Sequence, residues 1–279
     1  MTSTSVQDAN IVQLQSGKQL YVEITRSDAS DATAIVFMHG LGSTTTFWEA
    51  TLADTRLSER YTLIRYDFDG HGLSPFSFAS GSSSLSLEDL VEDLKGVLDY
   101  AKVDKAEGIV GHSMSGLVAS TFAAKYPERL GKLVLLGAMQ ALGPATQEVM
   151  MNRSESVLKS GLSALVPQIV NSALSQHTKA TSPLCAALVR ALVLPTKPDA
   201  YAGACQALAR ARDPDYGAIE AKTLIISGED DYMSPKATTD FFAENIKDVG
   251  IAVIKDVGHW HAVEAPLKLR RIFEEFFLL

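Results

Sequence analysis

Short apolar runs alternate with helical patterns along most of the chain, and this alternation limits the folds open to it. Residues 33–38 (TAIVFM) and 223–227 (TLIIS) are continuous runs rich in β-branched side chains, typical of strands buried on both faces of a sheet. Residues 85–101 carry apolar side chains three and four positions apart, as on one face of a helix. Strands that alternate with helices predict an α/β fold, with a mostly parallel central sheet and helices on both faces.

The expected elements form two groups separated by a helical insert. We predict strands at residues 11–14, 19–25, 33–38, 61–66, 106–110, 132–136, 223–227 and 250–254. We predict helices at residues 48–57, 85–101, 115–126, 236–245 and 266–279. Between residues 144 and 212 the spacing is helical and punctuated by proline, so we expect three or four helices inserted after the sixth strand. The predicted core comprises residues 1–143 and 213–279, and the insert comprises residues 144–212.

Composition narrows the classes of function. The 279 residues are 46% hydrophobic, which is enough for one sizeable core. A net charge of −8 is poorly suited to holding phosphate backbones, so we expect no nucleic-acid partner. No apolar run approaches the ~20 residues that span a bilayer, and Met1 to Asn10 are polar without a basic start. We therefore expect no membrane span and no signal peptide, in a soluble cytoplasmic protein whose oligomeric state the sequence leaves open.

The cysteines and histidines do not form a metal-site pattern. Cys185 and Cys205 are too few for a disulfide framework, and neither has metal-ligand spacing. Two small buried residues or a single bridge both fit this pair. The histidines are spread among loops without an HExxH motif, so we expect no metal and no cofactor.

The strongest local signal is a serine between a predicted strand and a predicted helix. Ser113 lies in GHSMSG at residues 111–116. A nucleophile elbow has this setting, in which a sharp, strained turn exposes the serine Oγ above the sheet. The usual pattern is G-x-S-x-G, but here Ser115 takes the last position and Gly116 follows one residue later. Serine is small, so we expect the turn to form and Ser113 to be the nucleophile.

Two further polar groups follow strands on the same rim of the predicted sheet. Asp230 and Asp231 come after residues 223–227, and His259 comes after residues 250–254. A histidine that takes a hydroxyl proton needs a carboxylate to fix its tautomer and stabilise its charged form. Residues 137–143, which follow the preceding strand, contain no carboxylate, so we expect the acid from the Asp230/Asp231 pair. The order serine, acid, histidine is that of a catalytic triad, with His259 as the base.

An oxyanion site is expected beside the nucleophile. Acyl transfer needs two backbone N–H groups aimed at the developing alkoxide. Met114, the residue after Ser113, is expected to supply one. Leu41, in the glycine-rich loop HGLG at residues 39–42, is expected to supply the other.

Together these motifs resemble the signature sequences of the α/β-hydrolase superfamily. They are HGLG (39–42), DFDGHGLS (67–74), GHSMSG (111–116), GEDDYMSP (228–235) and GHWHAVEAP (258–266). The resemblance implies the α/β-hydrolase fold and identifies the insert as a helical cap. It selects Asp231 over Asp230 as the acid. It also assigns His71 and Ser74 to a turn that shapes the sheet edge, and it makes Glu264 structural.

Within that superfamily, residues 152–165 and 201–219 are similar to the cap and post-cap segments of 3-oxoadipate enol-lactonases. Residues 170–194 lack the aromatic run of that family. The resemblance implies cofactor-independent hydrolysis of a small-molecule ester or lactone through an acyl-enzyme. Two alternatives use the same fold: a C–C bond hydrolase of a diketone-type substrate, and a non-catalytic ligand-binding protein. A haloalkane or epoxide hydrolase needs a carboxylate where Ser113 stands.

We expect the substrate pocket where the rim of the sheet meets the cap. Arg153, at the cap entrance, is the candidate for holding a substrate carboxylate. His261 is expected behind the triad or at the surface. The candidate apolar walls are Phe47, Trp48, Met114, Met139, Leu142, Tyr232, Met233 and Trp260.

Overall fold

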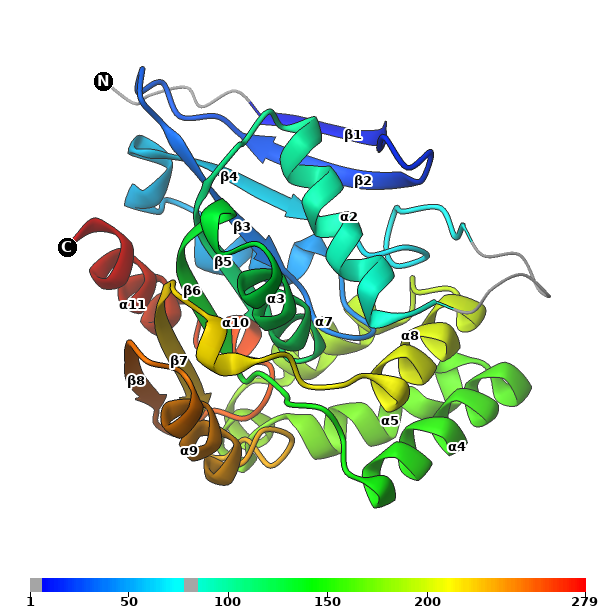
Figure 1. Cartoon of the computed structure of the whole chain (residues 1–279). Helices are drawn as coiled ribbons and strands as arrows, with labels where there is room; N and C mark the ends of the chain where they lie inside the picture. The colour runs from blue at the N-terminus through cyan, green and yellow to red at the C-terminus, as the bar shows by residue number, and fades with distance from the viewer. Residues whose placement is uncertain (1–6, 78–84) are drawn as a thin grey trace.

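A computed structural model describes residues 7–77 and 85–279, and these form an eight-stranded sheet flanked by helices (Figure 1). Residues 1–6, part of the polar start of the chain, lie outside the described ranges. The strands are β1 (Gln7–Gln13), β2 (Gln19–Thr25), β3 (Thr33–Met38), β4 (Tyr61–Tyr66), β5 (Ala106–His112), β6 (Leu130–Leu136), β7 (Lys222–Gly228) and β8 (Val249–Ile254).

The strand order is β1-β2-β4-β3-β5-β6-β7-β8. β2 pairs antiparallel with both β1 and β4, and the other neighbours pair in parallel. The predicted mostly parallel sheet is therefore confirmed, and each predicted strand forms. Their ends differ by a few residues: β1 begins at Gln7 because its ladder with β2 continues to the pair Gln7–Thr25. β5 continues to His112, which pairs with Leu136 of β6.

Helices cover both faces of the sheet. α2 (Leu87–Tyr100) and α3 (Met114–Lys125) pack together in front of it in Figure 1. α11 (Pro266–Leu278) packs with α1 (Glu49–Leu52), and its Phe277 ring fills the space above Gly108 of β5. α9 (Lys236–Asn245) packs on β7 and β8. The short α10 (His261–Glu264) precedes α11.

The helix predicted at residues 48–57 is wrong. The segment instead forms a 3-10 turn (Thr45–Trp48), the single turn of α1, and a second 3-10 turn (Arg56–Glu59). The chain leaves the helical conformation at Ala53 and reaches φ 51° at Asp54. The Thr55 side chain then accepts the N–H of Leu57 and caps the next turn. The Thr55 cap therefore starts a new turn where the spacing of apolar residues predicted one continuous helix.

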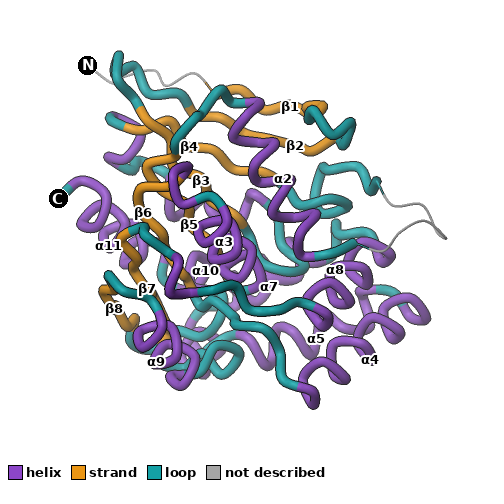
Figure 2. Tube along the Cα trace, in the orientation of Figure 1, coloured by secondary structure: helices purple, strands orange, loops and turns teal. Residues whose placement is uncertain are grey.

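The insert between β6 and β7 holds five helices where we predicted three or four. They are α4 (Pro144–Ser160), α5 (Leu162–Ala173), α6 (Gln176–Thr181), α7 (Pro183–Val193) and α8 (Pro198–Arg210). α4 packs along α8, and Figure 2 shows these helices gathered at one end of the molecule. Gly161 alone separates α4 from α5, at φ 73°. Because a single glycine divides two stretches of helical spacing, periodicity gives little sign of the break.

Two features of the described residues concern disulfide bonding and membrane spanning. Cys185 on α7 and Cys205 on α8 are both free thiols, so the bridge that the sequence left open is not formed. Among the helices of residues 7–77 and 85–279, none has the length and apolar character needed to cross a membrane.

Several histidines are buried in the core as neutral groups. His39 accepts the N–H of Phe68 at Nε2, 3.0 Å away, and its Nδ1 donates to the Gly40 carbonyl at 2.8 Å. Burial lowers the pKa of His39 to about 3 and that of His71 to about 4. Burial also lowers the pKa values of His112 and His261. The four side chains are almost completely shielded from solvent.

These histidines predict a loss of stability in mild acid. A histidine whose pKa is lowered by folding contributes stability that is fully present above ~6.5 and is lost as the pH falls, because the unfolded chain binds the proton first. Asp67 and Asp93, whose pKa values burial raises to about 6, act in the opposite direction but are fewer. For His71→Asn, we expect the difference in unfolding free energy between about pH 7.5 and about pH 5.5 to shrink by roughly 1 kcal/mol.

Urea unfolding at the two pH values measures this difference. His177→Asn is the matched control, because His177 is exposed on α6 and its replacement leaves the difference unchanged. An undiminished difference in the His71 variant would contradict the assignment of His71 as a neutral core histidine.

Candidate active site

Ser113 occupies a strained turn between β5 and α3. Its backbone lies at φ 57° and ψ −120°, in the region that L-residues rarely adopt. The Ser113 N–H donates to the Leu136 carbonyl at 3.0 Å, and the Ser113 carbonyl accepts the N–H of Gly116 at 2.9 Å. These bonds hold the serine at the carboxyl end of β5, with its side chain lining a pocket.

Small residues around the turn allow strand and helix to pass closely. A Cβ on Gly111 would collide with the Ser115 carbonyl, and a Cβ on Gly116 would collide with Ala138. Ser115 takes the position usually held by glycine and is fully buried. Its Oγ lies 2.9 Å from the carbonyl oxygens of both Met38 and His112, so its hydroxyl has a partner. The substitution is therefore compatible with the turn.

The three residues predicted as a triad form one hydrogen-bonded chain. The Nε2 atom of His259 lies 2.8 Å from Ser113 Oγ. Its Nδ1 atom lies 2.9 Å from Oδ2 and 3.0 Å from Oδ1 of Asp231. Asp231 follows β7 and His259 follows β8, so two loops on one rim meet at the serine.

Asp231 is held as a carboxylate in a buried position. Its Oδ1 also accepts the N–H groups of Met233 and Ser234, each at 2.9 Å. Burial would raise the pKa of Asp231, but the attraction and hydrogen bond of His259, with the Ser234 N–H, lower it to about 2. Asp231 is therefore ionised at neutral pH and fixes the proton of His259 on Nδ1.

The main chain of His259 is held from several sides. Its N–H donates to the Ala173 carbonyl at the end of α5, 2.7 Å away. Its carbonyl lies 2.8 Å from His112 Nε2 and 2.8 Å from His261 Nδ1. The Glu264 carboxylate accepts the N–H groups of residues 258 and 260 on either side, and that of Ser175 in the insert. The insert and the core therefore both hold the loop that carries His259.

The expected oxyanion donors lie beside the serine. Met114 is the first residue of α3, where helix geometry leaves the N–H without an intrahelical partner. Leu41 lies in the loop after β3, and a Cβ on its neighbour Gly40 would come within 3.0 Å of Ser113 Cβ. Leu41 and Met114 both line the same pocket as Ser113.

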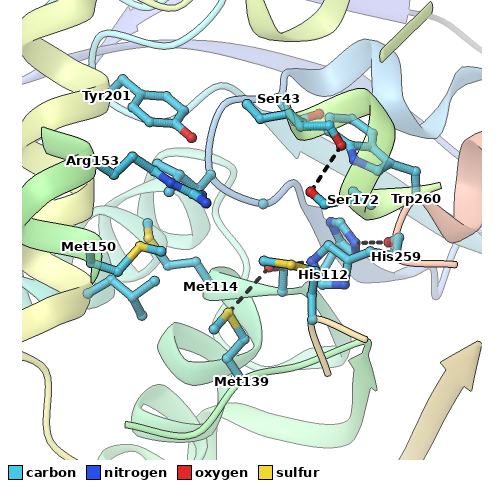
Figure 3. Close-up of a pocket in the computed structure, with 17 residues that line it drawn as sticks. Ser43, His112, Met114, Met139, Met150, Arg153, Ser172, Tyr201, His259 and Trp260 are labelled. Atoms are coloured by element: carbon cyan, nitrogen blue, oxygen red, sulfur yellow. Dashed lines mark hydrogen bonds between the residues drawn. The ribbon is translucent and has the colours of Figure 1, made fainter. Parts of the chain in front are cut away.

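The pocket lies between the rim of the sheet and the insert. Figure 3 shows Arg153 and Tyr201 on one side of it, and His259 and Trp260 on the other. Its lining residues are Gly40, Leu41, Ser43, His112, Ser113, Met114, Met139, Met150, Arg153, Ile169, Ser172, Ala173, Tyr201, Leu208, Met233, His259 and Trp260. Within the described ranges, no group of three or more His, Cys, Asp or Glu side chains is arranged to hold a metal ion.

The family model of the alpha/beta hydrolase fold matches residues 33–266. The chain belongs to the α/β-hydrolase family.

Relatives and solved structures agree with this assignment. The chain is 29% identical over 269 residues to 3-oxoadipate enol-lactonase 1 of Acinetobacter baylyi, covering 93% of each chain. It is also 29% identical over 254 residues to a 2-hydroxy-6-oxononadienedioate/2-hydroxy-6-oxononatrienedioate hydrolase of Burkholderia vietnamiensis, covering 87% of this chain and 86% of the relative. The crystal structure of the enol-lactonase from Burkholderia xenovorans LB400 superposes with a TM-score of 0.87 at 24% identity, covering 97% and 100% of the two chains.

The structure of this α/β-hydrolase places some predicted wall residues outside the pocket. Met139, Arg153 and Trp260 line it, as do Met114 and Met233. Trp48 does not, because its ring is fully buried in the core between Phe37 and Phe273. Tyr232 does not, because its side chain is 78% exposed. Phe47 and Leu142 are also absent from the lining.

Sequence reasoning missed the residues that the insert contributes. These are Met150, Ile169, Ser172, Ala173, Tyr201 and Leu208, together with Ser43 from the core. They come from α4, α5 and α8, and helical periodicity does not tell which face of each helix turns toward Ser113. The Tyr201 ring packs on the positive-φ residue Gly42 in the loop after β3, a contact that local sequence patterns do not reveal.

Arg153 introduces a permanent positive charge. Among the described lining residues, it is the one with such a charge, and no described carboxylate lies within ion-pair distance of it. Its side chain lies close to Tyr201, whose pKa burial raises, so that the phenol stays protonated. The guanidinium therefore keeps donors available toward the pocket.

The buried hydroxyl of Ser115 predicts a stability effect. In Ser115→Ala, a carbonyl at the turn loses its buried hydrogen bond, and we expect the unfolding free energy to fall by about 1 kcal/mol. Urea unfolding measures the change. Ser156→Ala is the matched control, since it removes a similar bond to the Asn152 carbonyl on the exposed face of α4. Equal effects of the two substitutions would mean that the Ser115 bond does not support the turn.

Proposed function

We propose that the chain is a cofactor-independent serine hydrolase that cleaves a carboxylic ester or lactone of a small molecule through an acyl-enzyme. The observation that carries this proposal is the contact of His259 Nε2 with Ser113 Oγ at 2.8 Å, while Nδ1 of the same ring contacts Asp231. A neutral imidazole so placed can accept the hydroxyl proton while the carboxylate stabilises the cation that forms.

In the acylation step, His259 takes the proton of Ser113 as Oγ attacks the substrate carbonyl. The tetrahedral oxyanion is held by the N–H groups of Leu41 and Met114, which are in place before the reaction. His259 then gives its proton to the leaving oxygen. In a lactone the leaving alcohol remains tethered to the acyl group, so ring opening produces one hydroxy-acyl chain on Ser113.

Deacylation repeats these steps with water. His259 removes a proton from water, the hydroxide adds to the acyl carbonyl, and the same N–H groups hold the second oxyanion. Collapse releases the carboxylic acid as His259 returns the proton to Ser113 Oγ. No metal or organic cofactor takes part in either half of the reaction.

The direct test compares wild type with Ser113→Ala on p-nitrophenyl acetate, p-nitrophenyl butyrate and a panel of lactones. Because the serine provides the attacking atom, we expect kcat to fall by at least ~10³-fold in the variant. Circular dichroism verifies that the variant remains folded. Turnover that persists in folded Ser113→Ala would reject the acyl-enzyme on Ser113.

The substrate class is expected to include an anionic group. We propose that Arg153 binds a carboxylate of the substrate, because its guanidinium lines an otherwise mainly apolar pocket and faces no described carboxylate. The enol-lactonase relative at 29% identity supports the same class. The apolar walls of Met139, Met150 and Trp260 would contact the carbon chain between the anion and the reacting carbonyl.

Arg153→Met tests this substrate class with two esters of one leaving group. For p-nitrophenyl hemisuccinate, which carries a carboxylate, we expect kcat/KM to fall by about 10- to 100-fold, the effect of losing a charged hydrogen bond. For neutral p-nitrophenyl butyrate we expect a change of less than about threefold. Arg190→Met is the control, since Arg190 is exposed on α7. Equal losses on both esters would exclude an anion-binding role.

C–C bond hydrolysis of a diketone-type substrate is the second candidate reaction, and the Burkholderia vietnamiensis relative, named as a hydrolase of 2-hydroxy-6-oxo dienedioates and trienedioates, supports testing it. A diketone-type acid in the same substrate panel tests it. Turnover of that compound, with none of the esters and lactones, would assign the chain to C–C bond hydrolysis. A folded protein that turns over none of these compounds would support a ligand-binding role.

A further inference from the structure

His261 lies directly behind the proposed triad and touches two of its members. It is fully buried in α10. Its Nδ1 lies 2.8 Å from the carbonyl oxygen of His259. Its Nε2 has no hydrogen-bond partner among the described residues and lies 3.7 Å from Oδ2 of Asp231. The ring therefore spans from the main chain of the base to the carboxylate that orients the base.

The contact with the carbonyl fixes where the proton of neutral His261 resides. A carbonyl oxygen only accepts, so Nδ1 carries the hydrogen. The lone pair of Nε2 then faces Asp231 Oδ2, and two electron-rich atoms oppose each other without a proton between them. A proton on Nε2 would turn this contact into a charge-assisted hydrogen bond to Asp231.

The chain leaves room for that contact to shorten. Gly137, at φ 48° after β6, borders both groups. A Cβ at this position would lie 2.5 Å from His261 Cε1 and 2.9 Å from Asp231 Oδ2. The absence of a side chain at Gly137 therefore lets the imidazole and the carboxylate approach each other.

Several charged or titratable groups act on His261. Asp231 faces it from the loop after β7, His112 from the end of β5, and His259 and Glu264 from its own segment. Burial lowers the pKa of His261 most strongly, and the nearby Asp231 carboxylate opposes this. His261 is therefore neutral at neutral pH and binds a proton only in acid.

We propose that His261 is a positioning residue for the reaction: as a neutral donor it holds the main chain of His259, and when protonated at Nε2 it binds Asp231 Oδ2 in competition with His259. This inference rests on the proposed serine hydrolase function. Oδ2 lies 2.9 Å from His259 Nδ1, and Oδ1, which lies 3.0 Å from the same atom, already accepts two backbone N–H groups, so a second donor on Oδ2 weakens the support of the base. Two protons then stop the reaction in acid, one on His259 Nε2 and one on His261 Nε2.

The test measures the pH dependence of Ser113 labelling by a fluorophosphonate probe, which needs no knowledge of the substrate. In that reaction Oγ forms a bond to phosphorus, fluoride leaves, and His259 takes the hydroxyl proton. We expect the logarithm of the wild-type rate to approach a slope of two against pH on the acidic side, above the onset of acid unfolding. A limiting wild-type slope of one would overturn the proposal.

Two substitutions separate the two roles of His261. His261→Asn keeps a donor for the His259 carbonyl, in the place of Nδ1–H, but has no atom that binds the second proton. Its acidic limb should have a slope of one. His261→Ala loses both roles, and we expect its labelling rate at about pH 8 to fall by about tenfold, a loss that His261→Asn mostly restores. His177→Asn, at an exposed site, leaves both slope and rate unchanged.

A spectroscopic measurement on the wild-type protein gives a result that depends neither on the folding of the variants nor on activity. In wild-type protein with ¹⁵N-labelled histidine, the His261 resonances should shift toward the imidazolium in the pH range where the slope becomes two. A His261 signal that stays neutral throughout the acidic limb would overturn the proposal even if the variants misfold. If the probe fails to label Ser113 at all, the serine hydrolase function fails, and the His261 titration still shows whether this ring binds a proton in acid.

Discussion

The left-handed backbone of Ser113 is the constraint on which the site depends. An L-residue stays at φ 57° only where its surroundings determine the conformation more strongly than its own preference. Here β5 lies between β3 and β6 in the middle of the sheet, and the Ser113 N–H is fixed to Leu136 of β6. Strand and helix then pass too closely for a Cβ at Gly111 or Gly116. The exposed Oγ is thus a consequence of central sheet packing, and a loop at the edge would not hold it.

The position of His259 depends on the insert as much as on the core. His259 donates its N–H to Ala173 at the end of α5, and Glu264 links both flanking N–H groups to Ser175 at the next turn of the insert. A shift of α5 would therefore change the hydrogen bonds of the loop that carries the imidazole. Because Ala173 also lines the pocket, a helix that shapes the pocket holds His259 as well.

The sequence predicted the parts of the site that lie where strands end. Ser113, His259 and the Asp230/Asp231 pair each follow an apolar run, and parallel strands bring such ends to one rim, so local pattern and topology suffice to place them together. The choice of Asp231 over Asp230 needed the resemblance to the α/β-hydrolase family. The position of Tyr201 in the pocket could not be predicted in this way, and the predicted wall residue Trp48 packs in the core against Phe37 and Phe273. Tyr201 turns toward Gly42 because of how α8 lies on α4, and that packing is not encoded in the periodicity of either helix.

The otherwise mainly apolar pocket has charges of opposite sign on its two sides. Asp231 keeps its negative charge behind His259, where backbone N–H groups and the imidazole neutralise much of it. Arg153 stands across the pocket with donors left over. Under the proposed function, and in a medium that screens poorly, these charges would favour a substrate whose anionic end faces Arg153 and whose carbonyl faces the N–H groups of Leu41 and Met114. In the proposed reaction the same field would stabilise the imidazolium that forms on His259 during attack, because Asp231 is the nearer charge. Orientation of the substrate and activation of His259 would then be two effects of one charge arrangement.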